Sequence, residues 1–306
     1  MSLAFLCPGQ ASQKVGMGKD IYNNTDLGQE YFAIANEIMG ENIQDIIFNG
    51  PKEKLKETQF TQPAIYIVSV IIGKLLIEYG AKPICAAGHS LGEYSALTLA
   101  GSFDFVTGLN LVKIRAIEMQ KAGQNTKGNM AAILGLDDDI VSEICNNYTE
   151  GVVVVANYNA KGQVVISGEI ESVKNIMNKL INAGASRAIQ LNVSGAFHSP
   201  LMSDAKEALT QKLLSIDIKD SKIPVYANVS SKSINKSSDI RQSLIDQLDQ
   251  PVKWHQTVTN MVANGVISGV EVGPGRVLKG LSKRIDRSLN MISVESHEEI
   301  VNFEYV

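Results

Sequence analysis

The sequence predicts an α/β fold in which a larger subdomain carries a small, inserted ferredoxin-like subdomain. Segments typical of strands and helices alternate from the N-terminus, which indicates an α/β sheet. Between residues 127 and 194 the order changes to β-α-β-β-α-β, the split unit of ferredoxin-like folds. We therefore expect the larger subdomain to comprise residues 1–126 and 195–306, and the smaller one residues 127–194.

The composition is that of a globular protein with a full core, since 44% of the 306 residues are apolar and 20% are charged. The net charge of −4 and the absence of a dense run of lysine and arginine argue against nucleic acid as a partner. The longest apolar segment, residues 64–76, is interrupted by Tyr66, Ser69, Gly73 and Lys74, so we expect no membrane-spanning helix.

The three cysteines, Cys7, Cys85 and Cys145, are odd in number and far apart in the sequence. They predict neither a disulfide framework nor a zinc site, and a reducing cytoplasm fits them. The opening residues MSLAFLCPGQ have no basic region before their apolar residues. They therefore indicate a first strand and not a signal peptide.

The elements of the inserted segment follow from its alternating and helical patterns. In order, we expect a strand at 129–136, a helix at 137–148, strands at 152–156 and 163–167, a helix at 170–183 and a strand at 186–193. Asp137 is suited to cap the first of these helices. After the insert, strands near 225–229 and 268–272 resume the α/β pattern, and a Gly-Pro-Gly turn leads into a helix from Arg276.

The stretch Gly88-His89-Ser90-Leu91-Gly92 fits the pattern G-x-S-x-G. A short apolar run at 83–87 predicts a buried strand before it, and small and apolar residues at 91–100 predict a helix after it. Strand, tight turn and helix are the context of a nucleophile elbow, in which glycines permit the turn and the serine hydroxyl is left exposed. The pattern also arises by chance in turns, but this context favours the elbow.

A serine nucleophile needs a general base, and the sequence offers four histidines. His89 lies on the elbow, where its ring should point away from the hydroxyl, His255 follows Trp254 at a helix start, and His297 lies in a polar C-terminal segment. His198 stands where the insert returns to the larger subdomain, a seam at which pockets form. By elimination we assign His198 as the base. No acidic residue between Ser90 and His198 obviously ends a core strand, which leaves a backbone or amide carbonyl to orient the imidazole.

Arg115 borders the apolar stripe of a predicted helix at 105–122, so its guanidinium faces inward. An inward arginine needs an anion. Two interpretations stay open: an ion pair with a protein carboxylate such as Glu118, or a bidentate clamp for a substrate carboxylate.

Eight motifs spread over nearly the whole chain point to one family. They are CPGQASQKVGMG, TQPAI, GHSLGEYSAL, RAIEMQ, ANYNAKGQVVISG, GAFHS, QLDQPVKW and VEVGPGRVLKGL. With these motifs the chain resembles the malonyl-CoA:acyl carrier protein transacylases and the acyltransferases of polyketide synthases. The resemblance implies an α/β-hydrolase-like core that carries a ferredoxin-like insert.

The resemblance also implies roles for individual residues. Ser90 would be the acylated nucleophile, His198 its base and Arg115 the carboxylate clamp. Gln247 matches the position whose carbonyl orients the histidine. The backbone N–H groups that form the oxyanion hole, the site that binds the negatively charged oxygen of the tetrahedral intermediate, match Gln10 and Leu91. The matching pocket residues are Gln62, Met119, Asn159, Gln163 and Phe197.

Two departures from the family pattern are small. Ala116 follows Arg115 where the family often has glycine, and PGQAS replaces the commoner PGQGS. Phe197 before His198 resembles the malonyl-selective pattern.

The implied activity is transfer of a malonyl group from malonyl-CoA to the phosphopantetheine thiol of acyl carrier protein, through a malonyl-serine intermediate, for fatty acid synthesis. We expect a cytoplasmic monomer that needs no metal or other cofactor and binds neither nucleic acid nor a membrane. The first alternative is a free-standing acyltransferase that loads polyketide synthase carrier proteins. A serine thioesterase would not need the inward Arg115, and a non-catalytic carrier-binding module would not need Ser90 at an elbow.

Overall fold

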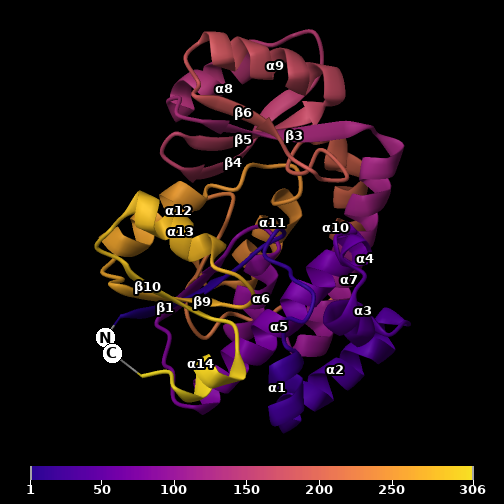
Figure 1. Ribbon diagram of the computed structural model, residues 1–306, viewed down its shortest axis with the longest axis vertical. Coiled ribbons are helices and arrows are strands. Elements are labelled where there is room, and N and C mark those ends of the chain that lie inside the picture. Colours follow the sequence, from indigo (N-terminus) through magenta and orange to yellow (C-terminus); the bar gives the residue numbers. More distant parts are fainter. Residues whose placement is uncertain (1, 305–306) are drawn as a thin grey trace.

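The computed structural model describes residues 2–304 and contains two sheets, one in each of two subdomains (Figure 1). A six-stranded sheet forms the centre of the larger subdomain, and a four-stranded sheet forms the smaller one. The chain enters the smaller subdomain from the end of a long helix and then returns to the larger one (Figure 1). The predicted fold class is thus confirmed. The boundaries at residues 127 and 194 stay a prediction, and all four strands of the small sheet lie between them.

The large sheet has the order β10-β9-β1-β2-β7-β8. Its strands are β1 (Leu3–Cys7), β2 (Cys85–Gly88), β7 (Val225–Tyr226), β8 (Ser233–Ile234), β9 (Ser268–Val272) and β10 (Asn290–Val294). All pairs are parallel except the short edge pair of β7 with β8. Cys7 at the end of β1 lies opposite Gly88 at the end of β2. Because parallel strands share a carboxyl edge, the segments that follow β1 and β2 meet at one place.

Helices cover both faces of this sheet (Figure 1). They are α1 (Lys19–Asn24), α2 (Asp26–Met39), α3 (Ile43–Asn49), α4 (Lys52–Leu55), α5 (Thr58–Glu78), α6 (Gly92–Leu99), α7 (Phe105–Asn125), the 3-10 turn η1 (Pro200–Met202), α10 (Ser203–Ser215), α11 (Ser237–Asp246), α12 (Trp254–Ala263), α13 (Val277–Ile285) and α14 (His297–Val301). Ser199 caps η1 by accepting a hydrogen bond from the Leu201 N–H, and Pro200 occupies the first position of that turn.

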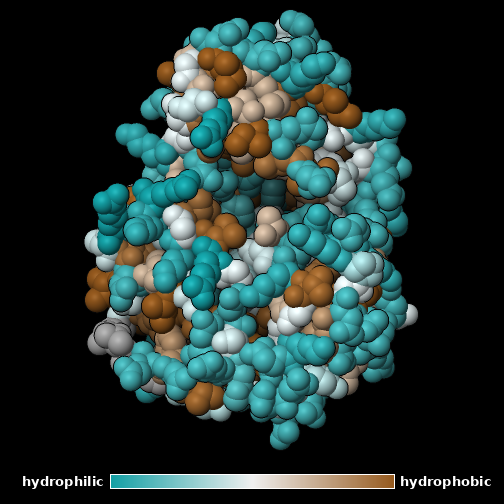
Figure 2. Space-filling model, in the orientation of Figure 1, coloured by the Kyte–Doolittle hydropathy of each residue, from teal (hydrophilic) through white to brown (hydrophobic). Residues whose placement is uncertain are grey.

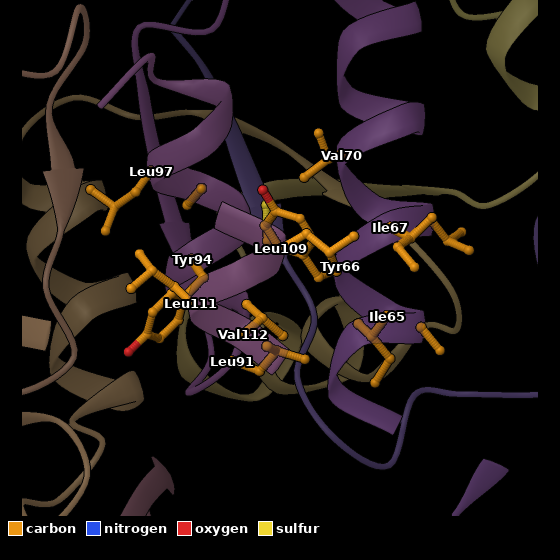
Figure 3. Packing of buried hydrophobic residues seen from close by; sticks show 14 of the residues in the cluster. Ile65, Tyr66, Ile67, Val70, Leu91, Tyr94, Leu97, Leu109, Leu111 and Val112 are labelled. Atoms are coloured by element: carbon orange, nitrogen blue, oxygen red, sulfur yellow. The ribbon is translucent and has the colours of Figure 1, made fainter. Parts of the chain in front are cut away.

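The core of the larger subdomain is built around α5. Tyr66 and Val70 of α5 lie beside Leu109 of α7, and Leu97 of α6 lies nearby (Figure 3). The Tyr66 hydroxyl also pairs with the Thr98 hydroxyl at 2.8 Å. Within residues 2–304, α5 alone is long and apolar enough to span a bilayer, and 89% of its most apolar window is buried inside the protein.

The smaller subdomain has the strand order β4-β5-β3-β6, and all of its strand pairs are antiparallel. Its elements are β3 (Gly128–Leu134), α8 (Asp138–Asn146), β4 (Val153–Ala160), β5 (Gln163–Glu169), α9 (Ile170–Asn182) and β6 (Arg187–Gln190). This is the predicted β-α-β-β-α-β order, and Asp137 caps α8 by accepting a hydrogen bond from the Asp139 N–H at 3.0 Å. Helices α8 and α9 cover the far face of the sheet, so its other face looks toward the larger subdomain (Figure 1).

Several strand lengths differ from the prediction. Strands β4 and β5 form a longer ladder that reaches Ala160 and Glu169, whereas β6 ends at Gln190 and β7 has only two residues. Strand β6 is an edge strand with mostly exposed side chains, so its hydrophobic pattern does not set its length. Strands β8 and β10 were not predicted. Both are edge strands, which form by hydrogen bonding to a neighbouring strand and need no apolar run in their own sequence.

Candidate active site

The predicted nucleophile elbow lies between β2 and α6. Ser90 has a left-handed backbone with φ of 52°, a conformation that costs energy for a non-glycine residue. A Cβ atom added to Gly88 would lie 1.9 Å from the Gly92 carbonyl carbon, and one added to Gly92 would lie 2.0 Å from the Cys7 carbonyl oxygen. Both glycines of G-x-S-x-G are therefore required by close backbone packing, which explains the pattern physically.

Asn228, two residues after β7, holds the elbow in place. Its side-chain oxygen accepts a hydrogen bond from the Ser90 N–H at 2.7 Å, and its side-chain amide donates to the Gly88 carbonyl at 2.6 Å. Sequence reasoning missed Asn228. The available signal was its position at the end of the strand predicted near 225–229, at the carboxyl edge where functional groups gather.

His198 is positioned as a base for Ser90. Its Nε2 lies 2.8 Å from the Ser90 Oγ, and its Nδ1 lies 2.8 Å from the backbone carbonyl oxygen of Gln247. A carbonyl only accepts, so Nδ1 carries the proton and the Nε2 lone pair faces the hydroxyl. Burial, followed by the positive charge of Arg115, lowers the pKa of His198 to about 3. The imidazole is therefore neutral near pH 7 and can accept a proton.

The guanidinium of Arg115 is fully buried and lies beside the nucleophile. One terminal nitrogen donates to Gln62 Oε1 at 2.6 Å, and the other donates at 3.0 Å to both Ser90 Oγ and Gln247 Oε1. Across the described chain no carboxylate lies within ion-pair distance of Arg115. Glu118 pairs instead with Lys121 at 2.8 Å. The interpretation of Arg115 as an ion-pair partner of Glu118 is therefore wrong.

Two backbone N–H groups stand free near the hydroxyl. The N–H groups of Gln10 and Leu91 donate no hydrogen bond to any of the described residues, and both residues line the same cavity as Ser90. The loop after β1 reaches the elbow because Gly9 packs on it: a Cβ added there would lie 2.4 Å from the His89 carbonyl oxygen. The two N–H groups are available to an oxyanion as the sequence predicts.

A cavity of about 240 Å³ lies between the two subdomains, and the surface is hollowed there (Figure 2). It contains all the predicted pocket residues, namely Gln62, Met119, Asn159, Gln163 and Phe197. The His89 Nε2 lies 2.8 Å from Asn159 Oδ1, and this residue lines the same cavity as Ser90. Sequence reasoning missed most of the apolar wall, which comes from Met130, Val165, Leu191, Val193, Val277, Leu278 and Leu281.

Within residues 2–304, no group of three or more histidine, cysteine, aspartate or glutamate side chains could hold a metal ion. The arrangement can instead perform nucleophilic acyl chemistry, since it combines a serine, a neutral base and free N–H donors.

Comparisons with known proteins agree with this geometry. The acyl transferase domain family matches residues 4–297. The chain is 40% identical over 300 residues to the malonyl CoA-acyl carrier protein transacylase of Bacillus subtilis strain 168, covering 97% of this chain and 95% of that one. It is 42% identical over 284 residues to the same enzyme of Escherichia coli K12, covering 92% of each. The chain belongs to the malonyl CoA-acyl carrier protein transacylase family.

Solved structures of this transacylase family superpose closely on the chain. The malonyl CoA-acyl carrier protein transacylase of Coxiella burnetii has a TM-score of 0.95 at 38% identity, covering 98% of this chain and 96% of that one. A malonyl-transacylase solved in complex with its type II polyketide synthase acyl-carrier protein has a TM-score of 0.94 at 38% identity, covering 98% of each chain. The family resemblance predicted from the motifs is thus confirmed.

Proposed function

We propose that this protein is a malonyl-CoA:acyl carrier protein transacylase that loads malonyl groups for fatty acid synthesis. The observation that carries the proposal is the Arg115 guanidinium, buried without a carboxylate partner and 3.0 Å from the Ser90 Oγ. A buried cation whose direct hydrogen-bond acceptors are all neutral, next to a nucleophile, fits an acyl group that carries its own carboxylate near the thioester. Malonyl-CoA has that structure, and acetyl-CoA lacks it.

The first half-reaction acylates Ser90. Its Oγ attacks the thioester carbonyl of malonyl-CoA while His198 Nε2 accepts the hydroxyl proton. The N–H groups of Gln10 and Leu91 stabilise the negative charge on the carbonyl oxygen in the tetrahedral intermediate. The C–S bond then breaks, and the CoA thiolate takes the proton from His198. The backbone carbonyl of Gln247 holds the ring in place throughout.

The second half-reaction reverses these steps with a different thiol. His198, neutral again, takes the proton of the phosphopantetheine thiol as that sulfur attacks the malonyl-serine ester. The tetrahedral oxyanion uses the same two N–H groups. The C–O bond breaks, His198 returns the proton to Ser90, and the malonyl-carrier product leaves.

The walls of the cavity contribute to selection. Phe197 and Met119 are buried and line the space around Ser90, which limits room for branched acyl groups. Arg115 offers a planar set of donors that a carboxylate matches in two parallel hydrogen bonds.

A polyketide carrier is the second candidate acceptor, because a structurally similar malonyl-transacylase is known in complex with a type II polyketide synthase carrier. The decisive experiment supplies malonyl-CoA and either a fatty acid or a polyketide carrier protein in the phosphopantetheinylated form, and measures malonyl-carrier by mass spectrometry. The matched control is each carrier without its phosphopantetheine. Release of free malonate with neither carrier loaded would contradict the proposal and favour a thioesterase.

We further propose that the protein acts as a cytoplasmic monomer without a metal or other cofactor, and binds neither nucleic acid nor a membrane. The net charge of −4 and the burial of α5 support the last two points. Light scattering coupled to gel filtration measures the oligomeric state directly.

A further inference from the structure

Glu93 is a buried carboxylate that the reaction steps above do not use. It lies one turn after Ser90 on α6 and is 0% exposed. One carboxylate oxygen accepts hydrogen bonds from the Gln247 side-chain amide at 2.8 Å and from the Asn228 N–H at 3.1 Å. The other accepts from the Ser243 hydroxyl at 3.0 Å. Burying a carboxylate costs free energy unless such donors satisfy it, so a buried carboxylate next to the nucleophile requires a physical explanation.

The Gln247 side chain connects this carboxylate to Arg115. Its Nε2 donates to Glu93 at 2.8 Å and to the Ser90 carbonyl at 2.9 Å, while its Oε1 accepts from Arg115 at 3.0 Å. An amide has one donor end and one acceptor end. The carboxylate requires the NH₂ end, and the guanidinium requires the oxygen end. The two charges therefore hold the amide in one orientation between them.

Two of the groups around Ser90, the His198 imidazole and the Arg115 guanidinium, thus depend on one residue. The backbone carbonyl of Gln247 orients His198, and its side-chain oxygen supports Arg115. If the amide flipped, its NH₂ group would face the guanidinium and its oxygen would face the carboxylate. Both contacts would become repulsive, and Arg115 would lose one of its three acceptors.

We propose that Glu93 is a positioning residue that acts through the Gln247 amide to hold the Arg115 guanidinium in place, and so contributes to the selection of acyl groups that carry a carboxylate. The proposal rests on the function proposed above. Glu93 is therefore not the histidine-orienting acid that the sequence analysis looked for. Its carboxylate supports the substrate clamp through an amide and does not contact His198. A purely structural role, in which Glu93 only joins α6 to Asn228 and α11, is the competing explanation.

The test compares Glu93→Gln with the parent in the rate of Ser90 acylation by malonyl-CoA and by acetyl-CoA. Glutamine keeps the size of the side chain but removes the charge that orients Gln247. We expect the malonyl-to-acetyl ratio of kcat/KM to fall by about tenfold or more. Acetyl transfer should change much less, because it does not use the clamp. Ser243→Ala is the matched control, since it removes a hydrogen bond from the same carboxylate without touching Gln247, and its ratio should equal that of the parent.

The ratio in the parent background separates the two explanations, and the Arg115→Ala background tests whether Glu93 acts through Arg115. If Glu93 acts through Arg115, adding Glu93→Gln to Arg115→Ala leaves the ratio unchanged. A proportional loss with both substrates, in both backgrounds, means a structural role and overturns the proposal. If Glu93→Gln fails to fold, Glu93→Asp replaces it: the charge is retained but withdrawn from Gln247, so the ratio should still fall, and an unchanged ratio overturns the proposal. A parent protein that malonyl-CoA does not acylate at all would instead refute the proposed function.

Discussion

Arg115 donates a hydrogen bond to the Ser90 hydroxyl oxygen over 3.0 Å. That donor occupies a lone pair of the oxygen, and His198 Nε2 lies 2.8 Å away on the same atom. The hydroxyl proton is therefore directed to the base, and the group that would bind the substrate carboxylate touches the group that would carry the acyl chain. The proposed base and the proposed carboxylate clamp thus contact the same oxygen atom, and the predictions below test the two roles separately.

We predict that Ser90 carries the acyl group. Incubation of the parent protein with malonyl-CoA should add the mass of one malonyl group, and Ser90→Ala should abolish that addition. His198→Ala should retain the serine but slow acylation by about 10²–10⁴, the usual contribution of a general base. Intact-protein mass spectrometry over time measures both. A malonyl adduct that persists in Ser90→Ala would place the nucleophile elsewhere.

We predict that Arg115 selects substrates with a carboxylate. Acetyl-CoA would leave its guanidinium buried and without a charged partner, a penalty of about 2–5 kcal/mol. Because each 1.4 kcal/mol is a factor of ten, this penalty corresponds to a preference of roughly 30- to several-thousand-fold for malonyl-CoA. Arg115→Ala should lose malonyl transfer and keep or gain acetyl transfer.

Arg115→Lys is the matched control for that experiment. Lysine keeps the positive charge but cannot form two parallel hydrogen bonds, so it should recover only part of the preference. If Arg115→Ala prefers malonyl-CoA by the parent's ratio, Arg115 is not the carboxylate clamp.

The decrease of kcat/KM on the acid side of its pH profile should occur at a lower pH than for an ordinary histidine base. Burial and the charge of Arg115 lower the pKa of His198 to about 3, against an ordinary imidazole value near 6.5. The base is therefore deprotonated at any pH well above 3, and kcat/KM for acylation, which reports on the free enzyme, should be flat from about pH 8 to about pH 5. An ordinary imidazole would lose about tenfold by pH 5.5.

The same profile in Arg115→Ala, measured with acetyl-CoA because this variant should lose malonyl transfer, supplies an internal check. Removing the positive charge should raise the pKa of His198, so the acid limb should move to higher pH. Circular dichroism at each pH verifies that the protein is folded. An acid limb centred near pH 6.5 in the parent would show that a solvated imidazole acts as the base.

The elbow glycines are structural requirements. In Gly92→Ala the new methyl group would lie 2.0 Å from the Cys7 carbonyl oxygen, so the junction of β1 with the elbow must shift. We expect a loss of about 3 kcal/mol or more in the free energy of unfolding, together with loss of acylation. Urea denaturation measures the first quantity.

Gly280→Ala is the matched glycine control. Gly280 lies inside α13 with no atom within 4 Å of an added Cβ, so alanine should stabilise the protein by about 0.5–1 kcal/mol. Equal stabilities for the two alanine variants would mean that the close approach at the elbow is not required.

Much of the fold could be predicted from local sequence patterns. The elbow was predictable because a tight turn between strand and helix needs glycines at fixed places, and Gly88 and Gly92 occupy them. The split β-α-β-β-α-β unit was predictable because each element has its own periodicity and Asp137 marks a helix start. Strand lengths were predicted less well, since the residues of β6 and β7 are strands only where a neighbour pairs with them.

Sequence patterns alone predict which residues carry chemistry, namely a serine in an elbow, a histidine at a subdomain seam and an arginine on an inward helix face. The contacts of those groups become visible once the chain is folded. Helical periodicity places Arg115 inside but leaves open whether its partner is Glu118 or a ligand, and the fold surrounds it with neutral acceptors. Glu93 and Asn228 reach the site because the parallel order β1-β2-β7 brings distant segments to one carboxyl edge. Local sequence encodes turns and the buried faces of helices. Hydrogen bonds between residues more than a hundred positions apart form only because the folded sheet brings those residues together.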